Sequence, residues 1–80
     1  MEEFIKFKKD WLYKVTEDRD STGEEYVMVV EGIDSKERFP VRVTELTGSE
    51  KGKTNRWKKI VSSCGIEEIG HKDDYPEYFI

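Results

Sequence analysis

Three segments of the chain carry the apolar patterning that is typical of β-strands. Residues 10–17 concentrate Trp, Tyr, Val and Thr, which suit a pleated and half-buried surface. Residues 26–31 (YVMVVE) are almost entirely apolar, so we expect this strand at the centre of its sheet. Residues 38–46 (RFPVRVTEL) contain Pro40, which cannot donate to a strand ladder, so the third strand is expected at an edge or with a bulge. Short connections between the three strands predict an antiparallel meander.

The pattern after residue 53 predicts a helix. Its apolar residues recur at i, i+3, i+4 and i+7: Trp57, Ile60, Val61 and Cys64. Thr54 or Asn55 is a suitable N-cap, and Gly65 stands where a helix commonly ends. A helix of about ten residues is not stable alone in water, so we expect it to pack on the sheet with Trp57 and Cys64 buried.

These elements together predict an α+β fold: a small antiparallel β-meander with one short helix packed on it, in a single domain over residues 1–80. The pattern does not decide whether the sheet stays open or closes into a barrel. Residues 1–9 fit either a helical turn or an extension of the first strand. Residues 71–80 form an acidic, aromatic tail that is either a docking segment or a last strand. A last strand on so small a sheet could pair with a second copy, so a homodimer remains an alternative to a monomer.

The composition indicates a folded domain with a compact aromatic core. Apolar residues make up 35% and charged residues 40% of the chain, yet two Trp, four Tyr and four Phe are present, and large rings bury much surface each. No apolar run approaches the roughly 20 residues that cross a membrane, and residues 1–10 lack the apolar segment of a secretion signal. The single cysteine cannot form an internal disulfide. We therefore expect a reduced, cytoplasmic protein without a membrane partner.

The segment at residues 47–59 (TGSEKGKTNRWKK) contains the letters GKT, with which a phosphate-binding loop ends. Such a loop requires a glycine, four further residues and then Gly-Lys-Thr or Gly-Lys-Ser. The position of that first glycine is occupied by Thr47, and the available Gly48 is one residue late. Nucleotide hydrolases of this class also need a parallel sheet with long crossovers, which short turns cannot supply. We interpret the match as a coincidence.

Other catalytic and metal-binding patterns are equally weak, so we expect no enzyme activity and no cofactor. Cys64 lies in the predicted apolar stripe, which indicates a buried structural thiol. His71 is the only histidine, and without a CxxC pair the chain offers no set of nitrogen and sulfur ligands for zinc. The acidic pairs at residues 67–68 and 73–74 lack the alternating pattern of a calcium loop.

Charge is unevenly distributed along the chain, whose net charge is −4. A basic cluster at residues 51–59 precedes an acidic stretch that begins at Glu67. Such runs of charged residues commonly form a solvated face without a ligand. The more specific interpretation is that the basic cluster forms a surface that binds a polyanion. Because Trp57 belongs to the apolar stripe, the aromatic residues that could stack on a base are those of the sheet: Trp11, Tyr13, Tyr26 and Phe39.

Four pieces follow one another in the chain: STGEEY, the central apolar strand, RFPVRV and the predicted loop and helix NRWKKIVSSCGI. In this arrangement, over about residues 11–66, the chain resembles small phage-type single-stranded-DNA-binding proteins of the OB-fold class, which implies an OB-like barrel. The segment DDYPEYFI is similar to the acidic tails through which bacterial single-strand-binding proteins recruit partners, although its last residues read Tyr-Phe-Ile. The acidic net charge departs from this family, as does the lack of two closing strands unless residues 1–9 and 75–80 supply them.

Two hypotheses of function follow. The first is a non-enzymatic module that binds single-stranded nucleic acid, with these candidate residues: Arg38, Arg42, Lys51, Lys53, Arg56, Lys58, Lys59, Trp11 and Tyr13. The second is a small acidic protein-binding factor, such as a phage-encoded inhibitor or adaptor of a host protein, with these candidate residues: Asp73, Asp74, Tyr75, Tyr78 and Phe79. In the first, cationic side chains follow the phosphates, and in the second the tail docks on a basic or apolar groove.

Overall fold

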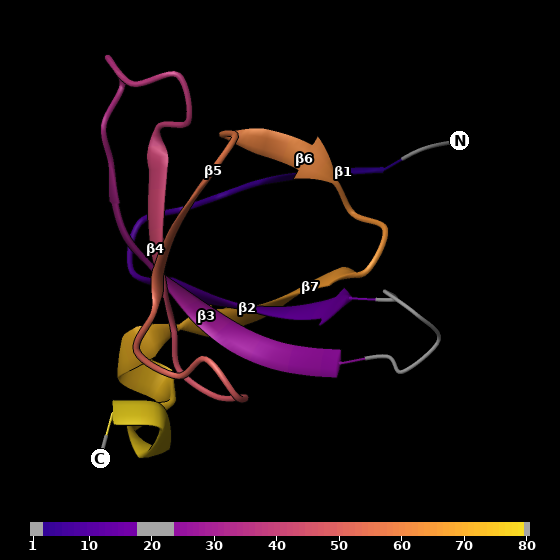
Figure 1. The fold of residues 1–80 in the computed structure, drawn as a ribbon, viewed down its shortest axis with the longest axis vertical. Coiled ribbons are helices and arrows are strands. Elements are labelled where there is room, and N and C mark those ends of the chain that lie inside the picture. The colour runs from indigo at the N-terminus through magenta and orange to yellow at the C-terminus, as the bar shows by residue number, and fades with distance from the viewer. Residues whose placement is uncertain (1–2, 18–23, 80) are drawn as a thin grey trace.

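The computed structural model describes residues 3–17 and 24–79, so the turn at residues 18–23 lies outside the described residues. The described residues form antiparallel strands and two short 3₁₀ turns (Figure 1). The elements are β1 Phe4–Lys6, β2 Trp11–Glu17, β3 Glu24–Ile33, β4 Val41–Glu45, β5 Thr54–Trp57, β6 Ile60–Ser62, β7 Ile66–His71, η1 Lys72–Asp74 and η2 Pro76–Phe79. Five strands form one sheet in the order β5-β4-β3-β2-β7, and β1 pairs with β6 in a separate two-stranded ribbon.

The predicted meander is confirmed, and β3 is its central strand. β2, β3 and β4 pair in sequence, and β5 extends the meander by one strand. The prediction of an edge position for the third strand is wrong, because β5 pairs with the outer side of β4. Pro40 lies just before β4, where its missing N–H costs no ladder bond. A bulge does occur in this pair, on β3, where the register shifts between Val30 and Gly32.

The predicted helix is absent: the part of the chain that the structure describes contains no α-helix, so the fold is all-β. The segment expected to be helical forms β5, a tight connection and β6. Trp57 is half-buried against the core as expected, but it reaches the core from a strand. Cys64 is exposed, so the prediction of a buried thiol is wrong. The extended conformation is more stable because pairing with β4 gives this segment ladder hydrogen bonds. A helix this short has a costly nucleus, and few residues of the segment have a high helix propensity.

The main core lies on one face of the five-stranded sheet, under the β1–β6 ribbon. Its buried side chains are Phe7, Tyr13, Val15, Met28, Val30, Val41 and Val43. Ile5 and Val61 lie directly opposite each other in the ribbon and pack against this cluster. This segment contributes β1, a separate strand that pairs with β6, so neither of its two alternatives, a helical turn or an extension of the first strand, is observed in the described residues. The sheet itself has two edge strands, β5 and β7, and the described residues do not close it into a barrel.

A smaller core lies on the opposite face of the sheet and is covered by the C-terminal segment. Leu12, Val27 and Val29 are buried there, with Tyr75 and Tyr78 packed against them. Tyr75 directly follows η1 and Tyr78 lies in η2, so this segment forms helical turns at the sheet, and the alternative of a last strand is not realised (Figure 1). Among the described residues, no helix has the length and apolar character needed to span a membrane.

Candidate nucleic-acid interface

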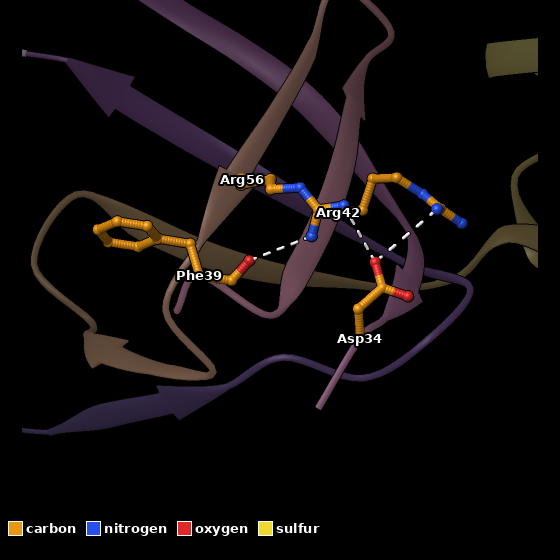
Figure 2. Close-up of polar contacts among 4 residues, drawn as sticks. All are labelled: Asp34, Phe39, Arg42 and Arg56. Atoms are coloured by element: carbon orange, nitrogen blue, oxygen red, sulfur yellow. Dashed lines mark hydrogen bonds and ion pairs between the residues drawn. The ribbon is translucent and has the colours of Figure 1, made fainter. Parts of the chain in front are cut away.

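Arg42 and Arg56 meet on the exposed side of β4 and β5 (Figure 2). They lie directly opposite each other in the antiparallel ladder, which places both side chains on the same face of the sheet. Their side chains are 46% and 41% exposed. Because like charges directly opposite each other destabilise a strand pair, this arrangement requires a compensating group.

Asp34 supplies that compensation. Its Oδ2 atom lies 3.2 Å from Arg56 Nη2 and 3.8 Å from Arg42 Nη1, so one carboxylate oxygen serves both guanidinium groups. The backbone of this loop is held by two hydrogen bonds: Asp34 N–H donates to the Pro40 carbonyl (2.7 Å) and Glu37 N–H donates to the Asp34 carbonyl (2.9 Å). The three side chains together carry one net positive charge.

The β3 bulge shapes the floor of this site. Gly32 pairs with Arg42 across the ladder, and a Cβ atom on Gly32 would lie 3.0 Å from Arg42 Nη2. The missing side chain therefore leaves room for the guanidinium group to lie over the bulge. The sequence pattern did not identify Gly32 or Asp34, although a glycine that interrupts an apolar strand commonly marks a bulge or a close approach.

Phe39 extends the site as an exposed aromatic ring. Arg56 Nη1 donates to the Phe39 carbonyl at 3.3 Å, while the ring projects away from the arginine pair (Figure 2). The Phe39 residue is 41% exposed, and the Arg38 guanidinium carbon lies 5.8 Å from the centre of its ring. We name Arg38, Phe39, Arg42 and Arg56 the arginine face. It combines three cations with an accessible ring.

The predicted lysines lie at the two ends of β5. Lys51 and Lys53 belong to the β4–β5 connection, where Lys53 Nζ forms an ion pair with Glu50 at 3.1 Å. Lys58 and Lys59 form the β5–β6 connection, and all four lysines are exposed. The structure thus brings Arg42 and Arg56 into one site and places the lysines beside it along the same edge of the sheet.

The GKT letters of this region form part of a hairpin connection. Gly52 has a positive φ of 93° in the turn, and Thr54 begins β5. A phosphate-binding loop requires a helix after the lysine, and a strand follows here. The interpretation of these letters as a coincidence agrees with this geometry.

Of the aromatic residues predicted to stack on a base, Phe39 belongs to the arginine face, whereas Trp11 and Tyr13 do not. Tyr13 is fully buried, so a base cannot reach its ring, and the prediction of stacking at this position is wrong. Lys8 N–H donates to Tyr13 Oη at 3.0 Å, and burial raises the pKa of the Tyr13 hydroxyl. Trp11 is half-buried, and Lys8 Nζ lies 4.3 Å from the centre of its ring. Both residues lie on β2, which β3 separates from β4.

Acidic residues gather at the other edge of the sheet. Glu67 and Glu68 belong to β7, and the exposed Asp73 and Asp74 follow in η1. The aromatic residues predicted to bind a partner differ in exposure. Tyr75 and Tyr78 pack against the sheet, and Tyr75 Oη donates a hydrogen bond to the Ile69 carbonyl at 3.3 Å. Phe79, by contrast, is 48% exposed. The uneven charge of the sequence therefore becomes a basic β5 edge and an acidic β7 edge of one sheet.

A shallow cavity of about 320 Å³ lies between β2 and the β6–β7 connection. Its charged side chains are Lys14, Glu25 and Glu67. Glu25 lies 3.1 Å from Lys14 Nζ and raises the pKa of that ammonium group, so the cation that the described residues contribute to this cavity already has a partner. Among the described residues, no group of three or more His, Cys, Asp or Glu side chains is arranged to hold a metal ion.

Comparison of the chain with protein-family models, with curated proteins and with solved structures finds no match. The geometry of the arginine face is therefore the basis for a functional proposal.

Proposed function

We propose that the protein is a non-enzymatic module that binds single-stranded nucleic acid on the arginine face. The observation that carries this proposal is the meeting of Arg42 and Arg56 across the β4–β5 ladder, next to the exposed ring of Phe39. Planar guanidinium groups suit phosphate oxygens because they donate two parallel hydrogen bonds. An exposed ring stacks on an unpaired base, which a duplex does not present.

The distribution of charge supports this role despite the net charge of −4. Lysines extend the arginine face at both ends of β5, while the carboxylates of β7 lie at the opposite edge of the sheet. A single-stranded nucleic acid that crosses β4 and β5 would meet Arg42 and Arg56, with lysines at both ends of β5. The family resemblance in the order of sequence features points to the same ligand class and remains part of the proposal.

Fluorescence anisotropy with a labelled oligothymidine at ~50 and ~200 mM salt tests this proposal. We expect binding that weakens as salt rises and that is lost in the double variant Arg42→Glu, Arg56→Glu. The matched control is Lys9→Glu, Lys72→Glu, which changes the net charge equally but lies outside the arginine face. An absence of binding at low salt, or equal losses in the two double variants, would refute the proposal.

The preference for single strands has a separate test. Replacement of Phe39 by Leu keeps an apolar side chain but removes the stacking surface, so it should weaken the binding of oligothymidine and leave any binding of a duplex unchanged. Equal weakening of both ligands would mean that Phe39 does not stack on a base.

A protein-binding role on the acidic edge is the second candidate. Its favouring observation is the concentration of exposed carboxylates on β7 and η1 next to the exposed ring of Phe79. A host protein with a basic groove would fit this surface. Capture from a host lysate should then be lost in Asp73→Lys, Asp74→Lys and retained in the control Glu50→Lys. Capture of the same protein by both variants would exclude the acidic edge.

A further inference from the structure

The Asp34 carboxylate forms ion pairs with both members of the arginine pair. Its Oδ2 atom is 3.2 Å from Arg56 Nη2 and 3.8 Å from Arg42 Nη1, so the contact with Arg56 is the closer of the two. We propose that Asp34 is an internal competitor, which a phosphate of the nucleic acid must displace from Arg42 and Arg56. This inference rests on the proposed function and concerns the same site.

The contacts of Asp34 are suited to displacement. The side chain is 41% exposed, and ion pairs in contact with solvent are weak. The hydrogen bonds that hold the loop involve the backbone of residues 34, 37 and 40, so rotation of the side chain can release the arginines without opening the loop. Arg56 keeps its second contact, to the Phe39 carbonyl, in either state.

The competitor has a thermodynamic signature in the salt dependence of binding. Each phosphate that a cation neutralises releases counterions, with a slope of about −0.7 per phosphate for single strands. While Asp34 neutralises one guanidinium charge, fewer counterions are released on binding. Removal of this carboxylate should therefore both tighten binding and steepen the salt slope.

The test compares Asp34→Asn with the unmodified protein in the oligothymidine titration at several salt concentrations. We expect the affinity to rise roughly two- to fivefold, the range that an exposed ion pair allows, and the slope to steepen by about 0.7. Glu25→Gln is the matched control: it removes one carboxylate from an exposed ion pair with Lys14 at the other end of β3, and it should leave both quantities unchanged. Asp34→Ser is a second variant in case the amide destabilises the loop, and thermal unfolding verifies that each variant is folded.

The outcomes separate the inference from the proposed function. If the unmodified protein binds and Asp34→Asn binds with the same or a lower affinity, the competitor is overturned. The nucleic-acid interface then stays in place, with Asp34 as a residue that positions the two arginines. Equal tightening in Glu25→Gln would overturn it as well, because the effect would then reflect net charge alone. Binding by neither protein would refute the proposed function itself.

Discussion

The ring of Phe7 meets the indole of Trp57 edge on, with 5.8 Å between the ring centres. Phe7 follows β1, and Trp57 ends β5, so this contact joins the ribbon to the sheet. The backbone joins at the same place, where Phe7 N–H donates to the Lys59 carbonyl at 3.1 Å. These interactions between distant parts of the chain explain why the segment around Trp57 is extended instead of helical.

Replacement of Phe7 by Ala should destabilise the protein strongly. Phe7 is 1% exposed and also packs edge on against Tyr13 at 4.9 Å, so the change would leave a cavity and cost about 3–5 kcal/mol. Phe4→Ala is the control, because Phe4 is 63% exposed and its loss should change stability by less than about 0.5 kcal/mol. Urea unfolding measures both. If Phe7→Ala does not fold, Phe7→Leu should still show a loss of about 1 kcal/mol. Equal effects at the two positions would contradict the burial of Phe7.

Gly65 should be much less tolerant of a side chain than Gly52. Both have positive φ, 76° and 93°, but a Cβ atom on Gly65 would lie 2.9 Å from the Thr16 carbonyl oxygen, whereas Gly52 has open space. Since Thr16 N–H also donates to the Gly65 carbonyl at 2.7 Å, the two backbones cannot easily separate. We expect Gly65→Ala to cost about 3 kcal/mol and Gly52→Ala about 1 kcal/mol in urea unfolding. A larger cost at Gly52 would contradict the close approach of the β6–β7 connection to β2.

Ionisation of Tyr13 should destabilise the fold at alkaline pH. Burial raises the pKa of the Tyr13 hydroxyl, so the folded state holds this proton more tightly than the unfolded state. The resulting stability is complete below about pH 10 and is lost as the pH rises through the raised pKa. Tyr13→Phe removes both this dependence and the acceptor of the Lys8 N–H, so it should cost about 1 kcal/mol at neutral pH. The stability difference between the two proteins, from urea unfolding across pH 7–11, should then narrow above pH 10. A difference that is constant over this range would show that Tyr13 ionises without a penalty.

Arg56→Lys should weaken oligonucleotide binding although the charge is retained. Arg56 reaches the Asp34 carboxylate and the Phe39 carbonyl with two different nitrogens, and a single ammonium group cannot reproduce this geometry. We expect a loss of roughly fivefold, which corresponds to about 1 kcal/mol for one polar contact. Lys53→Arg, which also retains the charge, should show no loss in the same anisotropy titration. An unchanged affinity in Arg56→Lys would mean that Arg56 contributes only its charge.

Cys64 should react with a thiol reagent in the folded protein. The residue is exposed in the β6–β7 connection, so its rate of reaction with Ellman's reagent should approach the rate in urea. A thiol buried beneath a packed helix would be protected by the folding equilibrium. Strong protection would therefore favour the helix over strands β5 and β6.

The local pattern correctly predicted the strands whose residues have similar surroundings along the whole strand. β2 and β3 were predicted because apolar, β-branched and aromatic residues are concentrated there, and a fully apolar strand is stable only in the middle of a sheet. The local pattern predicted the wrong element for the segment with Trp57, Ile60, Val61 and Cys64. The spacing of its apolar residues fits a helix, but these residues gain more from pairing as strands with β4 and β1. Short apolar runs of this kind do not distinguish the two by periodicity alone.

Residue type and order are enough to predict the central meander and the separation of basic from acidic residues along the chain. They do not predict the core, which contains more valine than aromatic residues. Which cations lie together depends on the fold: the β4–β5 register sets Arg42 opposite Arg56, and the β3–β4 loop brings Asp34 to both. The fold also decided that Tyr13 faces the core and Phe39 the solvent. The physical reason is that strand register and loop closure are set by contacts between residues distant in the chain, which no local pattern contains.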